Sequence, residues 1–535
     1  MNGQRAAAAA PGAASRWASA ARLEGRGADL VVLVGLLALA ALLRLPDLAT
    51  RGTFDGDQGT DALVVRTMIR GGVVPLLGPR TSIGAFHHGA PYYYLLAPSG
   101  VASGGDDPLA LAALIAVLGM AAVGVTWWLA RSIGGPGAGL VAGLLLAVSA
   151  TAVDGSTFIW NPNPIPFFSA VALAASWRAA AGGGARWWLL AGAAQAMVQQ
   201  LHVLGVLGLV PIGALWLASL LRSPGGRRRL LAVGLGMGGI IALGYVPLLV
   251  HELGSDFSET RGVLAWLAGA GSDAGGASLV ARLAFVPLRV ISWPLTGPIV
   301  EALGPAVLAV AGWSAAVAVA VVRARGDERR ALAWLGGSVA LATVALTLAV
   351  RSLAVVTPLP SDHYHAFLWP AITVSAGVAA AVIWRRRPAG ARAVAAATRV
   401  VVGLGIGALV AWNLGTQPPA VSPDGGWPAA AKAAGAVVAA PGGRPTVVVG
   451  VPAYKSTAAL VYPLTVEGHP PVIETLAARV TVLCDALFEE VVGLACEGPA
   501  EEARLAEVGI ATGPLVTRFE AAPGRWISVY EIAGR

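Results

Sequence analysis

The sequence predicts an all-α membrane bundle of about eleven transmembrane helices, followed by a small extracytoplasmic α/β domain. Of its 535 residues, 56% are apolar and only 12% are charged, and the mean hydropathy is +0.70. Soluble proteins carry about 25% charged residues, so these values exclude an ordinary soluble enzyme and a disordered chain. The net charge of +8 does not indicate a nucleic-acid partner, because the placement of basic residues matters more than their sum.

Eleven apolar stretches approach the length of about 20 residues that a bilayer-spanning helix needs. They lie near residues 30–45, 109–130, 138–153, 165–181, 187–201, 203–221, 230–250, 303–322, 331–350, 366–384 and 396–414. The apolar stretch 279–299 contains arginines and prolines, and counting it as a span would move an arginine-rich loop to the opposite side. We therefore expect 279–299 to lie on the membrane surface.

Basic residues fill alternate loops between these stretches, including the runs 222–229 and 323–330. The positive-inside rule then places the N-terminus in the cytoplasm and, with an odd number of spans, the C-terminal domain outside the plasma membrane. We expect residues 1–28 to form a disordered cytoplasmic tail and residues 29–414 to form the transmembrane domain. The first helix has no small-residue cleavage site at its end, so we expect it to be retained.

The composition changes after residue 414. Residues 415–426 are rich in Pro and Gly, which is typical of a linker, and we expect residues 427–535 to form the small domain. The patterns predict strands at 446–451, 471–473 and 526–532, and a short helix near 457–462.

The chain has two cysteines, Cys484 and Cys496, and both fall in this domain. An extracytoplasmic compartment allows a disulfide between them, and two free buried thiols are the alternative. Two cysteines without a histidine cluster argue against a metal site.

The long outward loop 46–108 carries the most informative polar residues. Asp55, Asp57 and Asp61 lie within seven residues of one another, and Asp57 and Asp61 share one face if the segment is helical. A carboxylate at the mouth of a helix bundle can take a proton from a hydroxyl group or hold a divalent cation. A solvated acidic loop is the alternative interpretation.

A second pattern follows in the same loop, where residues 87–96 read His-His-Gly-Ala-Pro-Tyr-Tyr-Tyr-Leu-Leu. Tyrosine at a membrane interface is ordinary. Aromatic rings with hydroxyl groups also suit sugars, against which they stack and to which they hydrogen-bond.

Together the two patterns resemble the GT-C integral-membrane glycosyltransferases, in particular glycosyltransferase family 39, with the protein O-mannosyltransferases and the lipid A aminoarabinose transferase. Asp57-Gln58 stands where that family has an Asp-Glu pair soon after the first helix. Residues 88–96 stand at its Pro-rich, Tyr-rich motif, which opens the second span. The resemblance covers 30–415 in architecture and is specific mainly in 44–98.

The resemblance implies the GT-C fold and an inverting transfer of a sugar from a polyprenyl-phosphate donor to a hydroxyl acceptor, which would be a protein, a glycolipid or a cell-wall glycan. It implies Asp57 as the general base, with Asp55 as the second catalytic candidate. Gln58 departs from the family's Glu, and Asp55 or Asp61 could replace that acid. The loop residues expected to bind substrate are Gln58, Asp61, His87, His88, Tyr92 and Tyr93. No cofactor is expected, and a divalent cation is compatible with the acids but not favoured.

Three further outward segments add the candidates Asn161, Asn163, His202, His363 and Tyr364. Asn163 stands where family members often carry Asp, and its amide can hydrogen-bond a sugar hydroxyl or cap a helix. His202 lies in an outer turn, where a polar group can line a cavity or simply face solvent. His363 and Tyr364 could bind the donor phosphate, with an interfacial aromatic belt as the alternative.

A transporter or flippase of lipid-linked sugars is the alternative function, and a structural or binding membrane protein is a third. Transporters favour paired halves and polar groups near the bilayer midplane, and the predicted spans show neither pattern. The sequence identifies neither the sugar nor the acceptor.

Overall fold

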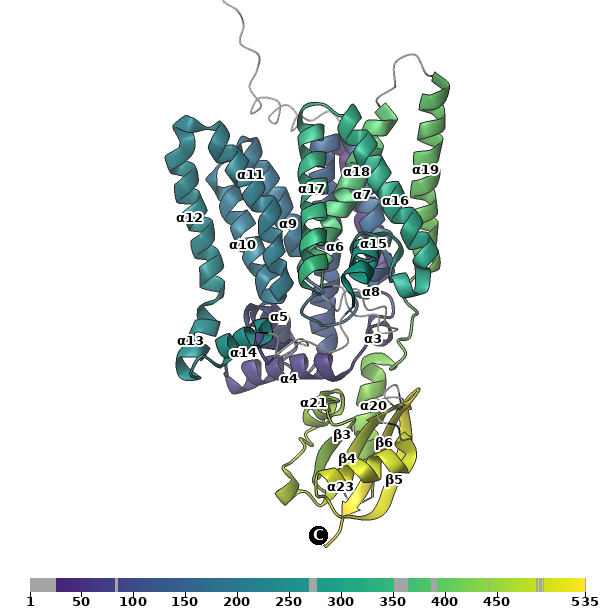
Figure 1. Cartoon of the computed structure of the whole chain (residues 1–535). Coiled ribbons are helices and arrows are strands. Elements are labelled where there is room, and N and C mark those ends of the chain that lie inside the picture. Colours follow the sequence, from purple (N-terminus) through teal and green to yellow (C-terminus); the bar gives the residue numbers. More distant parts are fainter. Residues whose placement is uncertain are drawn as a thin grey trace, which may run out of the picture.

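The computed structural model describes residues 26–81, 85–268, 277–350, 364–385, 392–441, 443–486, 489, 493 and 495–534. The predicted tail 1–28 falls outside these residues except for its last three, and the candidate His363 also falls outside them. The described chain forms a helical bundle with a small sheet domain at one end (Figure 1).

Apolar runs form the bundle, and their helices begin where the local sequence allows a helix start. Before α6, for example, the Asp107 carboxylate accepts the backbone N–H of Leu109 at 2.9 Å, and Pro108 occupies the first position, where its missing N–H costs nothing. The helices are α2 Arg26–Arg44, α3 Leu48–Arg51, α4 Gly56–Gly71, α5 Pro91–Ala102, α6 Pro108–Gly134, α7 Pro136–Val148, α8 Ala150–Asp154, α9 Ile165–Arg178, α10 Ala185–Leu201, α11 Leu209–Arg222, α12 Arg227–Gly244, α13 Val246–Gly254, α14 Ser258–Leu267, α15 Leu279–Thr296, α16 Ile299–Arg323, α17 Gly326–Ala349, α18 Trp369–Arg385 and α19 Arg392–Gly415. Helix α18 is the centre of the packing, since 94% of its apolar window is buried, against 17% for α2 and 6% for α19.

Nine helices in the described parts of the chain are long and apolar enough to cross a membrane, and the bent pair α12–α13 would make a tenth. About eleven spans are predicted from the sequence. The stretch 138–153 becomes the 13-residue α7 followed by the short α8, and the stretch 187–201 becomes the 17-residue α10. Both are shorter than a typical span, so length does not identify them as spans. The protein is nevertheless a multi-pass membrane protein.

The stretch 279–299 is apolar enough to count among the nine candidate spans, but both of its ends contact the acidic end of the bundle, as a helix that lies along the membrane surface would. Near its start, Arg282 donates to the carbonyls of Thr347 and Leu348 at the end of α17, and near its end the Trp293 carbonyl accepts the Thr151 hydroxyl of α8. This stretch forms α15, which packs against α16 and α17, and every residue from Arg289 to Thr296 is buried. The Arg289 guanidinium lies 5.0 Å from the centroid of the Trp293 ring. The ring therefore shelters the one charged side chain in the buried half of this helix.

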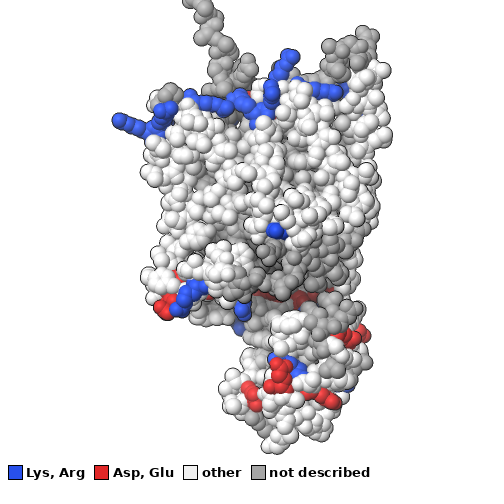
Figure 2. Space-filling view, viewed as in Figure 1, with Lys and Arg blue, Asp and Glu red and all other residues white. Residues whose placement is uncertain are grey.

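Charged residues separate along the long axis of the molecule (Figure 2). A dense group of Lys and Arg lies at the end of the bundle away from the C-terminal domain, and acids lie at the domain end and on the domain itself. Few charges lie between these two levels on the face shown. A bundle that crosses a bilayer needs this pattern, because charges in the hydrocarbon region are costly. The basic end is the one predicted to be cytoplasmic.

At the acidic end, α4 lies across the bundle, between the spanning helices and the C-terminal domain (Figure 1). An antiparallel hairpin, β1 Leu77–Arg80 and β2 His87–Gly89, connects α4 to α5.

The C-terminal domain contains a four-stranded sheet of order β3-β4-β6-β5. Strands β3 and β4 are parallel, and β6 is antiparallel to both β4 and β5. Apolar side chains on both sheet faces pack against helices. The elements are α20 Gly426–Ala439, β3 Thr446–Val451, α21 Ala458–Val466, β4 Arg479–Asp485, α23 Glu501–Glu507, β5 Thr512–Ala522 and β6 Arg525–Ile532.

The predicted strands 446–451 and 526–532 are confirmed as β3 and β6, and the predicted short helix corresponds to α21. The predicted strand 471–473 is wrong. This segment follows Pro470 and begins with Pro471, neither of which has an N–H for a strand ladder. The predicted disulfide between Cys484 and Cys496 is present, with the Cα atoms 5.6 Å apart.

We expect reductant to lower the unfolding temperature of the full chain in detergent. Opening the bridge gives the unfolded C-terminal domain more conformational freedom. This typically lowers the free energy of unfolding by about 2–4 kcal/mol. The Cys484→Ala/Cys496→Ala double variant is the control, since the chain has only these two cysteines and the variant cannot respond to reductant. A wild type that melts at the same temperature with and without reductant would contradict the expectation.

Candidate active site

The first turn of α4 carries the acidic motif, and two hydrogen bonds of Gln58 hold this turn in place. The side chain of Gln58 accepts the backbone N–H of Asp55 at 3.0 Å, in a capping arrangement typical of helix starts. The Gln58 amide also donates to the backbone carbonyl of Ile159 at 3.1 Å. Gln58 is buried, so its amide joins α4 to the segment that precedes α9.

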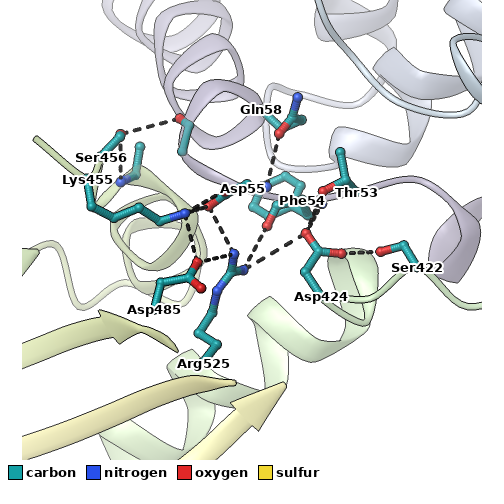
Figure 3. A network of polar contacts seen from close by, with 12 residues as sticks. Thr53, Phe54, Asp55, Gln58, Ser422, Asp424, Lys455, Ser456, Asp485 and Arg525 are labelled. Carbon is teal, nitrogen blue, oxygen red and sulfur yellow. Dashed lines mark hydrogen bonds and ion pairs between the residues drawn. The ribbon is translucent and has the colours of Figure 1, made fainter. Parts of the chain in front are cut away.

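Asp55 lies at the start of α4 and faces the C-terminal domain. The Lys455 ammonium donates to both of its carboxylate oxygens, at 2.7 and 2.6 Å, and Arg525 contacts it at 3.1 Å (Figure 3). These two cations hold the pKa of Asp55 below its ordinary value, although burial opposes them.

Asp57 is the exposed acid of this turn. The indole N–H of Trp160 donates to its carboxylate. Protein atoms nonetheless surround the carboxylate closely, and this partial desolvation, together with the negative charge of Asp55, raises the pKa of Asp57. Trp160 and the Lys455 charge act in the opposite direction and do not outweigh the rise.

Asp61 lies one turn further along α4 and is buried. The hydroxyl groups of Tyr92 and Tyr93 donate to its two oxygens at 2.8 and 3.0 Å. Burial raises the pKa of Asp61 to about 8, despite these two hydrogen bonds. The acidic motif and the tyrosine motif therefore meet at Asp61, which holds a proton at neutral pH. Both tyrosines are buried, with 0% and 2% of their surfaces exposed.

A row of aromatic rings leads from the hairpin to Asp57. The ring centroids of His88 and His202 are 4.8 Å apart, those of His202 and Tyr364 are 4.5 Å apart, and those of Tyr364 and Trp160 are 6.1 Å apart. Trp160 in turn donates to Asp57. Burial and the neighbouring His87 lower the pKa of His88 to about 4, so its ring is neutral.

The other candidates hold backbone segments in place. The side chains of Asn161 and Asn163 donate to the carbonyls of Leu201 and Phe158, at 2.6 and 2.8 Å. These bonds fix the turn that carries Trp160.

His87 lies apart from the ring row and joins the hairpin to α14. Its Nδ1 lies 3.0 Å from one oxygen of Glu259, whose other oxygen accepts the His87 backbone N–H at 2.7 Å.

Sequence reasoning missed three residues that contact the acids of α4, namely Trp160, Lys455 and Arg525. Trp160 directly precedes Asn161 in a segment that was selected for its asparagines. The only feature of the sequence that could have drawn attention to Lys455 is the rarity of lysine, since it is one of two lysines among 37 basic residues.

Within the parts of the chain that the structure describes, no three His, Cys, Asp or Glu side chains are grouped as metal ligands would be.

We expect stability to fall as the pH rises from about 4 to about 8. An unfolded Asp has a pKa of about 3.9, whereas native Asp61 keeps its proton up to a pH of about 8. The native state therefore binds more protons than the unfolded state across this window, and raising the pH favours unfolding.

Unfolding temperatures in nanodiscs at several pH values test this expectation. Asp61→Asn should flatten the slope. Tyr92→Phe should extend the loss to higher pH, because the Tyr92 hydroxyl favours the charged form of Asp61. An Asp61→Asn variant with the wild-type slope would assign the effect to another group.

No protein-family model and no curated protein sequence matches this chain. Solved structures do match it in fold. ArnT from Cupriavidus metallidurans in the apo state is 15% identical, with 95% of this chain and 98% of that chain covered and a TM-score of 0.57. The same protein bound to undecaprenyl phosphate is 16% identical, with the same shares covered and a TM-score of 0.58. The apo oligosaccharyltransferase from Archaeoglobus fulgidus is 13% identical, with 86% of this chain and 70% of that chain covered and a TM-score of 0.50. The chain thus has the fold of the GT-C membrane glycosyltransferases, as its two loop motifs predicted.

Proposed function

We propose that this protein is a membrane glycosyltransferase that moves a sugar from a polyprenyl-phosphate donor to a hydroxyl acceptor at the outer face of the plasma membrane. The observation that carries the proposal is the solvent-exposed Asp57, hydrogen-bonded to Trp160 at the end of a GT-C bundle. The similarity of fold to ArnT, whose structure has been solved with undecaprenyl phosphate bound, supports a lipid-phosphate donor.

In this proposal, Asp57 is the general base. Its carboxylate takes the proton of the acceptor hydroxyl as that oxygen bonds to the anomeric carbon. The bond between the anomeric carbon and the phosphate oxygen breaks, the lipid phosphate leaves with the electron pair, and the configuration inverts. A raised pKa suits this role, because a stronger base removes the proton more readily.

The neighbouring acids suit the role less well. Both oxygens of Asp55 accept bonds from Lys455, so a proton would have to displace an ion pair. Asp61 is buried, and its two oxygens accept bonds from tyrosines. We assign these two acids, together with Gln58, to holding the first turns of α4.

The ring row is the proposed contact for the donor, which would reach it at the half-buried rings of Trp160 and Tyr364, because His88 and His202 are buried. The ring centroids of Tyr364 and His202 are 4.5 Å apart, and Trp160 lies next to Tyr364. Imidazole, phenol and indole groups offer aromatic surface and also hydrogen-bond donors. Such groups suit a sugar ring and its phosphate. His87, Asn161 and Asn163 would act through the backbone segments that they hold.

The proposed orientation has the N-terminus in the cytoplasm and the C-terminal domain outside. The basic end of the bundle in Figure 2 supports it, since positive loops remain on the cytoplasmic side. No cofactor takes part in the proposed step.

We expect Asp57→Asn to lower the release of polyprenyl phosphate by about 10²–10⁴-fold, the usual contribution of a general base. The assay uses full-length protein in nanodiscs, a panel of labelled polyprenyl-phosphate sugars, and a membrane and cell-wall extract as acceptor.

Asp107→Asn is the matched control, because Asp107 is an exposed helix cap at the same end of the bundle and Asn caps equally well. If both variants keep wild-type rates, Asp57 is not the base. If the wild type binds the lipids and releases nothing, the transporter or flippase becomes the better assignment.

A further inference from the structure

The first turn of α4 is enclosed by the C-terminal domain. Lys455 bridges Asp55 of the bundle and Asp485 of β4, with its nitrogen 2.6 Å and 3.0 Å from their carboxylates. Arg525 of β6 bridges the same two acids at 3.1 and 3.4 Å (Figure 3). The Lys455 side chain is only 7% exposed and that of Arg525 only 11%, so water screens these pairs weakly.

The segment between α19 and α20 completes the enclosure. One oxygen of Asp424 accepts bonds from the Thr53 hydroxyl and the Phe54 backbone N–H, at 2.6 and 2.8 Å. The other accepts the Gly426 N–H at 3.0 Å and the Ser422 hydroxyl. The predicted linker is therefore a docked segment, and residues 53–55 are held from both sides.

Two glycines of the acidic motif permit this close approach. A Cβ atom on Gly56 would lie 2.4 Å from the Cβ of Ser456, and a Cβ on Gly59 would lie 2.2 Å from the carbonyl oxygen of Ala458. Both glycines have ordinary helical backbone angles, so their small size is what the site requires. The loop before α21 thus rests directly on the turn that presents Asp57.

From these contacts we infer that the C-terminal domain completes the active site, and that Lys455 is a positioning residue for Asp57. Lys455 holds Asp55, the residue at which α4 begins, and Asp57 lies within the same turn. The domain then fixes the direction in which the base points toward the acceptor. The inference rests on the proposed function of Asp57, and it assigns the domain a role in turnover beside any role in binding the acceptor.

The charges facing Asp57 allow a sharp test. Asp55 raises the pKa of Asp57, whereas Lys455 lowers it. Lys455→Met and Asp55→Asn both break the same ion pair, so a purely structural effect would be alike in the two variants. Their electrostatic effects on Asp57 have opposite signs.

We expect Lys455→Met to lower kcat by about 10–100-fold with a much smaller change in KM, because a small misplacement of the base slows the chemical step. The acidic limb of the pH–rate profile should move to higher pH in Lys455→Met and to lower pH in Asp55→Asn. Lys432→Met is the matched control. Lys432 is the other lysine of the chain, exposed on α20 of the same domain, and this variant should keep wild-type values.

Hydrogen exchange of the α4 amides in the same nanodisc samples provides a readout that needs no activity. Residues 56–60 should exchange faster in Lys455→Met and at the wild-type rate in Lys432→Met. Unchanged exchange, or acidic limbs that move in the same direction or not at all, would overturn the positioning role. A wild type that releases no lipid phosphate, combined with faster exchange in Lys455→Met, would reject the proposed function and keep the contact.

Discussion

The site depends on a group of charges that can be buried only together. Asp55 and its two cationic partners are far apart in the sequence, since Lys455 lies 400 positions after Asp55. The side chains of Lys455, Asp485 and Arg525 are only 7–11% exposed and need charged partners, whereas Asp55 is 35% exposed and keeps some contact with water. The ion pairs therefore join α4 to the C-terminal domain, and residues far apart in the sequence together complete this end of the bundle.

The same constraint gives three neighbouring carboxylates three different states. Asp55 is charged and paired, and Asp61 is neutral and hydrogen-bonded by tyrosines. Asp57, between them in the sequence, is an exposed residue whose partly desolvated carboxylate has a raised pKa. From their spacing in the sequence alone, these three acids are equally good candidates for the general base. Their surroundings separate them, because burial and partners decide which group can accept a proton.

The sequence predicts the parts of the fold that depend on short sequence patterns. Apolar runs, alternate basic loops and the two loop motifs were enough to predict a GT-C bundle, and strand patterns identified β3 and β6. By hydropathy alone the helix α15 passes as a span, but its two ends contact the same end of the bundle, which supports the prediction that it does not cross. Strands β4 and β5 were missed, and a strand was placed at two prolines where no ladder forms.

For the site, the sequence selected the right loop but could not select the right contacts. The rings of His88, His202 and Tyr364 were each noted as candidates, yet only the fold brings them into one row with Trp160. Lys455 lies in a domain without any recognisable motif, and its partner Asp55 lies 400 positions earlier in the sequence. Pairings over such separations follow from the packing of the whole chain and from no local pattern.

The glycines of the acidic motif show what the structure adds to the sequence. Gly59 weakens α4, since Gly costs about 1 kcal/mol against Ala in a helix interior, whereas Gly56 is the first residue of the helix. In the structure, both leave space for the start of α21 and the loop before it, where a methyl group on Gly56 would meet Ser456 and one on Gly59 would meet Ala458. The motif thus combines two requirements: acids for the chemistry, and small residues that let a distant domain reach them. A helix built only for stability would replace both glycines, and it would exclude the lysine that holds Asp55.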